Sequence, residues 1–189
     1  MPVRTDAEAE TPVVEAIRGG DRYAFGELMR RQNRWVRSVV FGVLGRSDCV
    51  DDVCQQVWTS VWLRISELRD ASAWRPWLYR LARNAAVDAG RDITRRRLRT
   101  QGAAVEEAAR LQPASSTDRR MAQAEQHREV LSAIQGLPAI YREPFVLRHV
   151  NGWSYKEIAS VMELPVDTVE TRLVRARRLL RETLKDKVA

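Results

Sequence analysis

Side chains that can hydrogen bond to nucleic-acid bases gather near the carboxyl-terminal end of the chain. Arginine recurs there at every third position, at Arg172, Arg175, Arg178 and Arg181. Thr168, Glu170 and Thr171 stand just before or among them. Arginine pairs with guanine through two parallel hydrogen bonds, threonine bonds bases or phosphate, and glutamate accepts from cytosine. The chemistry indicated is base recognition.

Two short helices are expected to position these side chains. Ser154 and Glu157 have the spacing of a capping box, which predicts a helix that begins at Tyr155. Pro165 suits the first turn of a second helix. Its apolar face is predicted at Val166, Val169, Leu173, Ala176 and Leu180. In a helix-turn-helix, the second helix of such a pair lies in the major groove. An ordinary helical hairpin with a solvated charged face is the alternative.

The composition favours a helical protein with a polyanionic partner. The chain has 189 residues, 44% hydrophobic and 30% charged, with few Gly and Pro. Its net charge of +7 attracts phosphates. RNA, an anionic membrane surface or no polyanion at all are the alternatives. The sequence contains no apolar run of about 18 residues, so no membrane span is predicted. Its polar start lacks the apolar core of a signal peptide. We therefore expect a cytoplasmic protein.

Neither a metal site nor an enzymatic centre is expected. Cys49 and Cys54 are five residues apart, so a helix would place them on different faces and disfavour a disulfide. No third Cys or His lies close enough in sequence to complete a zinc site. The chain also lacks a Gly-rich phosphate loop and an evident acid–base pair. We therefore expect no metal, no cofactor and no catalysis.

The chain divides into two predicted helical domains. We expect a disordered tail over residues 1–10, a helical domain over 11–98, a linker over 99–126 and a second helical domain over 127–189. The linker segment is rich in Ala, Gln and Ser and contains Gly102 and Pro113. The predicted fold class is all-α, with two small domains joined by a flexible linker.

Residues 48–65, DCVDDVCQQVWTSVWLRI, form the second segment with a functional pattern. A polar face is predicted at Asp51, Asp52, Gln55 and Gln56, opposite Val53, Val57 and Val61. Trp58 and Trp62 are four residues apart and lie on one side of the expected helix. Aromatic residues are enriched at interface hot spots. Core packing of Trp58 and simple solvation of the polar face are the alternatives.

Both segments resemble the sigma factors of bacterial RNA polymerase, in particular the small extracytoplasmic-function (ECF) type. The carboxyl-terminal resemblance to sigma domain 4 rests on Leu137-Pro138, Tyr141-Arg142, Tyr155 to Ala159, Thr168-Val169, Arg172-Leu173 and Arg175-Ala176-Arg177. Residues 48–65 resemble the region 2 helix that grips polymerase. Residues 68–99 resemble regions 2.3 and 2.4, through Trp77-Leu78, Leu81-Ala82, Asn84, Asp88 and Arg91. The two motif sets occur in the family's order.

The resemblance implies three sets of binding residues. Contacts with the beta and beta-prime subunits of core RNA polymerase are expected at Asp51, Asp52, Gln55, Gln56, Trp58 and Trp62. Contacts with single-stranded −10 DNA are expected at Leu68, Arg69, Asp70, Ala71, Ser72, Trp74, Arg80, Asn84, Asp88, Arg91 and Arg95. Contacts with duplex −35 DNA are expected at Tyr155, Lys156, Thr168, Glu170, Thr171, Arg172, Arg175 and Arg178.

Some positions depart from the family pattern. Asp167 stands where glycine is common, Glu170 often has a basic counterpart, and Leu68 often has a phenylalanine counterpart. The −35 sequence preference is therefore not transferable from a relative. We expect no fused regulatory domain, so a separate anti-sigma factor between the two domains is the expected control. A stand-alone helix-turn-helix regulator that does not bind polymerase is the alternative function.

Overall fold

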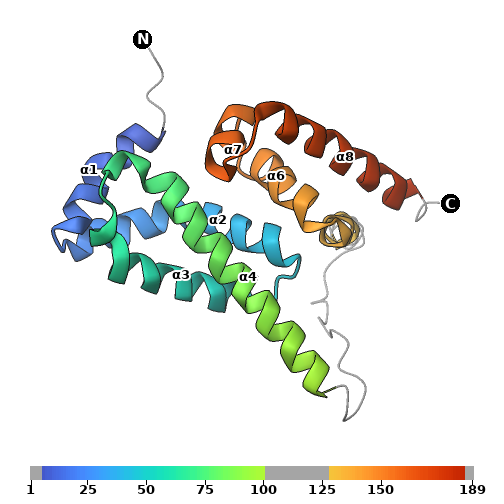
Figure 1. Ribbon diagram of the computed structural model, residues 1–189, viewed down its shortest axis with the longest axis horizontal. Helices are drawn as coiled ribbons and strands as arrows, with labels where there is room; N and C mark the ends of the chain where they lie inside the picture. The colour runs from blue at the N-terminus through green and yellow to red at the C-terminus, as the bar shows by residue number, and fades with distance from the viewer. Residues whose placement is uncertain (1–5, 101–127, 186–189) are drawn as a thin grey trace, which may run out of the picture.

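The computed structural model describes residues 6–100 and 128–185, which are helical and contain no strand in those ranges (Figure 1). The first domain consists of α1 (Asp6–Arg18), α2 (Arg22–Leu44), α3 (Val50–Arg64), two 3-10 turns (Ile65–Glu67 and Ala71–Ala73) and α4 (Trp74–Thr100). The second contains a helix over residues 128–136, then α6 (Ala139–His149), α7 (Tyr155–Met162) and α8 (Val166–Lys185). Among these helices, none is long and apolar enough to cross a membrane.

Local side-chain chemistry sets the helix ends. The Asp21 carboxylate accepts hydrogen bonds from the backbone N–H groups of Tyr23 and Ala24, at 2.8 and 3.1 Å, and so begins α2. Gly45 ends α2 in the left-handed conformation, at φ 68°. The predicted capping box is confirmed, because Ser154 and Glu157 each bond the other's backbone N–H at the start of α7.

Two predicted boundaries are corrected. A disordered tail was expected over residues 1–10, but α1 already begins at Asp6. Glu10 is buried and lies 3.4 Å from the Arg31 guanidinium and 3.4 Å from the Gln32 side-chain amide, so this part of the chain packs against α2. α4 runs on to Thr100, past the predicted start of the linker at residue 99. The rest of the predicted linker lies outside the described residues.

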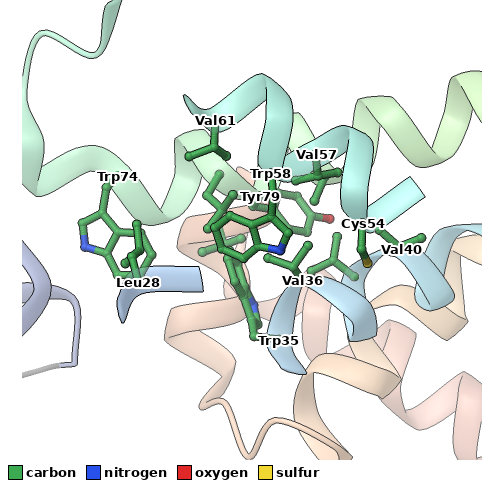
Figure 2. Close-up of a cluster of buried hydrophobic side chains, with 14 of the residues drawn as sticks. Leu28, Trp35, Val36, Val40, Cys54, Val57, Trp58, Val61, Trp74 and Tyr79 are labelled. Carbon is green, nitrogen blue, oxygen red and sulfur yellow. The ribbon is translucent and has the colours of Figure 1, made fainter. Parts of the chain in front are cut away.

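The core of the first domain is built around α2. Leu28, Trp35, Val36 and Val40 on this helix meet side chains from α3 and α4 (Figure 2). The predicted apolar face of α3 is confirmed, since Val53, Val57 and Val61 are buried. α2 also packs against α6 of the second domain.

The second domain packs directly on the first. Leu147, Trp153, Ile158 and Leu173 belong to the same buried apolar cluster as the α2 core. The Trp153 ring stacks on Trp35 of α2, with centroids 5.3 Å apart and planes inclined by 25°. The predicted arrangement of two helical domains is confirmed, and most of their buried apolar side chains belong to this one shared cluster. A smaller cluster lies within the second domain and contains Ala133, Leu137, Ala176 and Leu180.

Candidate functional site

The polar face of α3 is presented to solvent as predicted. Asp51, Asp52, Gln55 and Gln56 are exposed, whereas Val53 and its apolar partners on the opposite face are buried. Asp51 forms an ion pair with Arg37 of α2. This arginine was missed in the sequence, because a contact between two helices leaves no mark in local spacing. The face combines charge and amide groups on a helix that the core holds rigid.

A groove runs beside this face, between α2 and α3. It encloses about 740 Å³ and is lined by Phe25, Asn33, Arg37, Gln55, Trp58 and Trp62, among others. The two tryptophans differ in their environment. Trp58 is buried and donates its indole N–H to the Asn33 side chain at 3.0 Å, whereas Trp62 is only half-buried and packs 5.1 Å from the Phe25 ring. Of the two tryptophans, Trp62 is thus the one that a partner can reach.

Cys54 also lines this groove, and Figure 2 shows it among the buried side chains of the core. Burial raises the pKa of its thiol to about 11. The pKa of Cys49 is also raised, by burial and by the neighbouring carboxylate of Asp48. Both cysteines are free thiols. A thiol with a raised pKa holds its proton at neutral pH and is a poor nucleophile. Cys54 belongs to the buried apolar cluster, whereas Cys49 is only partly buried.

The turn segment before α4 carries several of the contacts expected with single-stranded −10 DNA, and these residues differ in burial. Leu68, Ala71 and Trp74 are core residues. Trp74 is 1% exposed and packs edge-on against Trp35, at a centroid distance of 6.4 Å. The two 3-10 turns point these apolar side chains inward. Their neighbours Arg69, Asp70 and Ser72 are exposed instead, so only these residues could touch DNA through their side chains here.

Asp70 shapes this exposed turn. Its carboxylate accepts hydrogen bonds from the Ser72 hydroxyl at 2.7 Å and from the Ser72 backbone N–H at 2.8 Å. Both hydrogen bonds lower the pKa of Asp70, and the bond from the Ser72 hydroxyl has the larger effect. The turn therefore carries a fixed negative charge beside the Arg69 side chain.

The predicted polar contacts on α4 fall on one side of the helix. Their spacing of three or four residues aligns them in one stripe, and all are exposed: Arg80, Asn84, Asp88, Arg91 and Arg95. Pairs along the stripe are loose, with 3.5 Å between Arg91 and Asp88. We call this set the α4 stripe. Its arginines are accessible to a polyanion.

The predicted recognition helix, α8, is amphipathic as expected. Val169, Leu173, Ala176 and Leu180 are buried, but Val166 is exposed, which corrects its predicted place in the apolar face. At the helix start the domain core does not reach Val166. The predicted contacts Glu170, Thr171, Arg175 and Arg178 are exposed, and Thr168 and Arg172 are half-buried. Thr171 donates its hydroxyl to the Asp167 carbonyl at 2.8 Å, which leaves its oxygen free to accept.

α7 and the segment before it hold the remaining predicted contacts. Lys156 is exposed, and Tyr155 is half-buried with the Arg148 guanidinium 5.3 Å from its ring centre. Arg148 also donates to the Trp153 carbonyl at 2.8 Å. This residue was not predicted, although its position before the helix pair is a signal that could have found it. Together Arg148 and Lys156 add positive charge beside α8.

The two domains bring predicted −10 and −35 residues to one place. A hollow of about 340 Å³ between α4 and the α7–α8 turn is lined by Arg80, Asn84, Glu163 and Arg172, among others. Arg80 and Glu163 form an ion pair across it at 2.7 Å. The α3 face takes no part in this junction, and Figure 1 shows α3 on the side of the first domain away from α8.

Comparison with known families assigns both halves of the chain. Residues 28–97 match the family described as Sigma-70 region 2. Residues 127–180 match the family described as Sigma-70, region 4. The first range covers α2 to α4, and the second covers the helix pair that carries the arginines.

Whole proteins and solved structures agree with these matches. The chain is 32% identical to the ECF RNA polymerase sigma-E factor of Escherichia coli K12, over 89% of this chain and 90% of that protein. It is 30% identical to the protein of that description from Haemophilus influenzae, with 89% and 91% covered. It resembles CnrH, solved in complex with the cytosolic domain of CnrY, with a TM-score of 0.68, 27% identity and coverage of 94% and 98%. It shares its fold with RpoE of Bartonella quintana, solved with the anti-sigma factor NepR, at a TM-score of 0.64, 24% identity and coverage of 85% and 96%.

Proposed function

This chain belongs to the ECF sigma factors of bacterial RNA polymerase, and from that premise we propose which of its surfaces perform each step of promoter recognition. A sigma factor binds core polymerase, directs it to promoters and promotes opening of the −10 element. The observation that carries the assignment is that α3 and α8 each bury one apolar face in the core and present one polar face to solvent. The protein contributes binding alone, and the chemistry belongs to the polymerase.

The α3 face is the proposed contact with the beta and beta-prime subunits. Trp62 and Phe25 supply an aromatic anchor in the groove, which Asp51 and Gln55 also line. Asp52 adds an exposed charge on the same helix. Interface hot spots combine a desolvated aromatic residue with flanking polar groups. Because α3 is braced by α2 and α4, little ordering is required when the partner binds.

The α8 surface is the proposed reader of the −35 element. Its first turns carry Thr168, Glu170 and Thr171, where a recognition helix meets base edges in the major groove. Arg175 and Arg178 follow on the exposed side and are placed to reach a guanine or a phosphate. Glu170 disfavours phosphate and favours a donor such as the cytosine amino group.

The exposed turn at Arg69, Asp70 and Ser72 is the proposed contact with the displaced −10 strand. Unstacked bases bond through their polar edges, which the Asp70 and Ser72 oxygens and the Arg69 guanidinium would meet. Further along α4, Arg91 and Arg95 are placed to bind the phosphates of the adjoining duplex. Capture of flipped bases by the turn would favour melting.

We place the protein in the cytoplasm with its polymerase, under the control of an anti-sigma factor. The solved structure of CnrH, which this chain resembles, also contains the cytosolic domain of a second protein, CnrY. Such a partner would act by covering the α3 face or by holding the two domains in one arrangement.

In vitro run-off transcription with purified core polymerase tests the proposal. Addition of the full chain to core and a pool of promoter fragments should produce specific transcripts that core alone does not make. The D52R variant should lose these transcripts and the association with core. E129R is the control, because it also replaces an exposed carboxylate by a guanidinium, outside every proposed surface, and should transcribe normally.

A different outcome would favour the stand-alone regulator. That result would be tight binding to duplex DNA without any association with core polymerase and without transcripts. Full transcription by D52R would instead remove α3 from the proposal and leave sigma activity in place.

A further inference from the structure

We infer that Arg142 and Glu143 form an interdomain latch, which keeps the free protein closed and unable to engage both promoter elements until polymerase opens it. The inference rests on the proposed function, because it concerns the −10 and −35 surfaces named above. The latch is defined as these two residues of α6 together with their partners on α2 and α4.

Arg142 joins the two domains through backbone carbonyls. It is 6% exposed, and its guanidinium donates to the carbonyls of Gly42 and Val43 in the last turn of α2, both at 2.8 Å. It also donates to the carbonyls of Gln135 and Leu137 in its own domain, both at 2.7 Å. Carbonyls in the last turn of a helix lack intrahelical partners and carry partial negative charge. Arg142 therefore caps α2 from the other domain.

Two glycines shape the end of α2 for this contact. A Cβ atom added at Gly45 would overlap the Arg142 guanidinium, and one added at Gly42 would lie 3.3 Å from the Glu143 Cα. Gly45 is also at φ 68°, so a larger residue there is strained as well. Small residues at both positions allow α6 to approach α2 closely.

Glu143 ties the same helix to α4. It is 6% exposed and accepts hydrogen bonds from the Tyr79 hydroxyl and the Arg83 Nε, both at 3.0 Å. Burial and the Glu143 charge raise the pKa of Tyr79, so its hydroxyl remains a donor. A buried carboxylate needs such donors. In the closed state, donors from the first domain therefore satisfy the carboxylate of the second.

The closed arrangement is incompatible with promoter binding at both elements. By their positions, the −10 and −35 elements are about 25 base pairs apart, or roughly 85 Å at about 3.4 Å per pair. A compact chain of this length has a radius of gyration of only about 16 Å. In addition, Arg80 of the α4 stripe is held by Glu163, and Arg172 of α8 faces the same hollow. The domains must separate before both surfaces bind DNA.

The core-binding surface remains available in the closed state. Asp52, Gln55 and Gln56 are exposed on α3, outside the interdomain contact. Polymerase can therefore bind the closed protein first, and release of the latch follows. This order predicts that the free protein binds promoter DNA poorly, and that loss of the latch raises its DNA affinity without polymerase.

A disulfide across the latch provides a direct test in the full chain. A Cβ atom at Gly42 would lie 3.9 Å from the Glu143 Cβ, within the range of Cβ separations in disulfides. G42C/E143C in a C49S/C54A background should lose run-off transcription when oxidised and regain it after reduction. The reduced protein is the matched control. Equal transcription by the oxidised and reduced forms would overturn the latch.

Opening variants test the same idea from the other direction. Y79F/R83A removes both donors to Glu143 and alters no residue of the proposed binding surfaces. It should increase the radius of gyration measured by X-ray scattering and tighten binding to a forked fragment, which carries the −35 duplex and a single-stranded −10 element, about tenfold or more in the absence of core. R64A, which removes an exposed ion pair with Glu67, is the control. A folded Y79F/R83A protein with the wild-type radius of gyration and the wild-type affinity for the forked fragment would contradict the latch.

These results separate the latch from the proposed function. If the wild-type chain supports core-dependent transcription and neither set of variants changes it or the DNA affinity, only the latch fails. If the wild-type chain gives no transcripts with core, the proposed function itself fails.

Discussion

Single residues in this protein divide sharply between packing and recognition, and the tryptophans show this most clearly. Trp74 is enclosed by the core, Trp58 is buried with its N–H bonded to Asn33, and Trp62 keeps an accessible edge. The same residue type therefore contributes to stability at one position and to binding at another. Burial decides between these roles.

Substitution of Trp74 and of Trp62 should separate the contribution to stability from the contribution to binding. W74A should destabilise the protein by about 3–5 kcal/mol, because it leaves a large cavity. W62A should leave the melting temperature nearly unchanged but weaken binding to core polymerase by more than about 1 kcal/mol, or about fivefold. Chemical denaturation and fluorescence anisotropy with labelled core measure the two quantities. A strongly destabilised W62A would show that this residue is structural.

The capping box at α7 makes a pH-dependent contribution. Burial alone would raise the pKa of Glu157, but bonds from the Ser154 N–H and hydroxyl, with the Arg75 charge, outweigh it and lower the pKa. The folded pKa thus lies below the unfolded value. The stabilisation is full above the unfolded pKa and is lost as the pH falls through the folded pKa.

We expect S154A to lower the free energy of unfolding by about 1 kcal/mol at neutral pH. The difference from wild type should shrink as the pH falls through the folded pKa of Glu157. Urea denaturation at a series of pH values measures it. S160A, an exposed serine in the same helix, is the control and should have little effect. A wild-type–S154A difference that is independent of pH would show that the Glu157 charge does not contribute.

At the scale of elements, α3, α4 and α8 obey one rule. Each has an apolar face in the core and a polar face with residues three or four apart. On α8, buried apolar residues and exposed polar residues continue along the helix. Arg175 and Arg181 are both exposed to solvent but lie almost two turns apart. Only the earlier of the two is near the amino-terminal end that enters a groove.

This geometry predicts unequal effects of the two arginines on −35 binding. R175A should weaken binding to a −35 duplex by about 1–3 kcal/mol and relax the preference at one base pair, if it reads a base. R181A should weaken binding less and equally across sequences. Anisotropy titrations at several salt concentrations, with core present, measure affinity and salt slope. Equal losses without any change in base preference would assign both residues to phosphate contacts.

At the scale of the whole molecule, the two domains share an apolar cluster, and we expect them to unfold cooperatively. Trp153 of the second domain stacks on Trp35 of the first, and Leu147 and Ile158 join the same cluster. A region held by this much apolar contact unfolds together with its support. The shared core also explains why separation of the domains requires a partner that supplies binding energy.

Calorimetry should therefore show a single unfolding transition for the wild-type protein. W153A removes the stacked ring and should uncouple the domains, which would split the transition in two and lower the first midpoint. V174A, an exposed residue on α8, is the control and should keep one transition. Two transitions in the wild type would show that the interdomain contact is weak in solution.

Much of this protein was determined by local sequence alone. The capping box at Ser154, the polar face of α3 and the amphipathic α8 were predicted correctly, because each depends on residues within a few positions of one another. The family also followed from local motifs, since their order along the chain is itself sequence information. The roles assigned to individual contact residues stay predictions.

The tertiary structure decided the features that depend on distant residues. Trp74 and Leu68 are buried, and α1 includes Glu10, because these segments pack against residues that are distant in the chain. Arg142 reaches a carbonyl of Gly42, which is 100 positions away in the chain. Nothing in the spacing of a helix encodes such a partner. Side-chain periodicity reports which face is apolar, and only packing in three dimensions decides what that face meets.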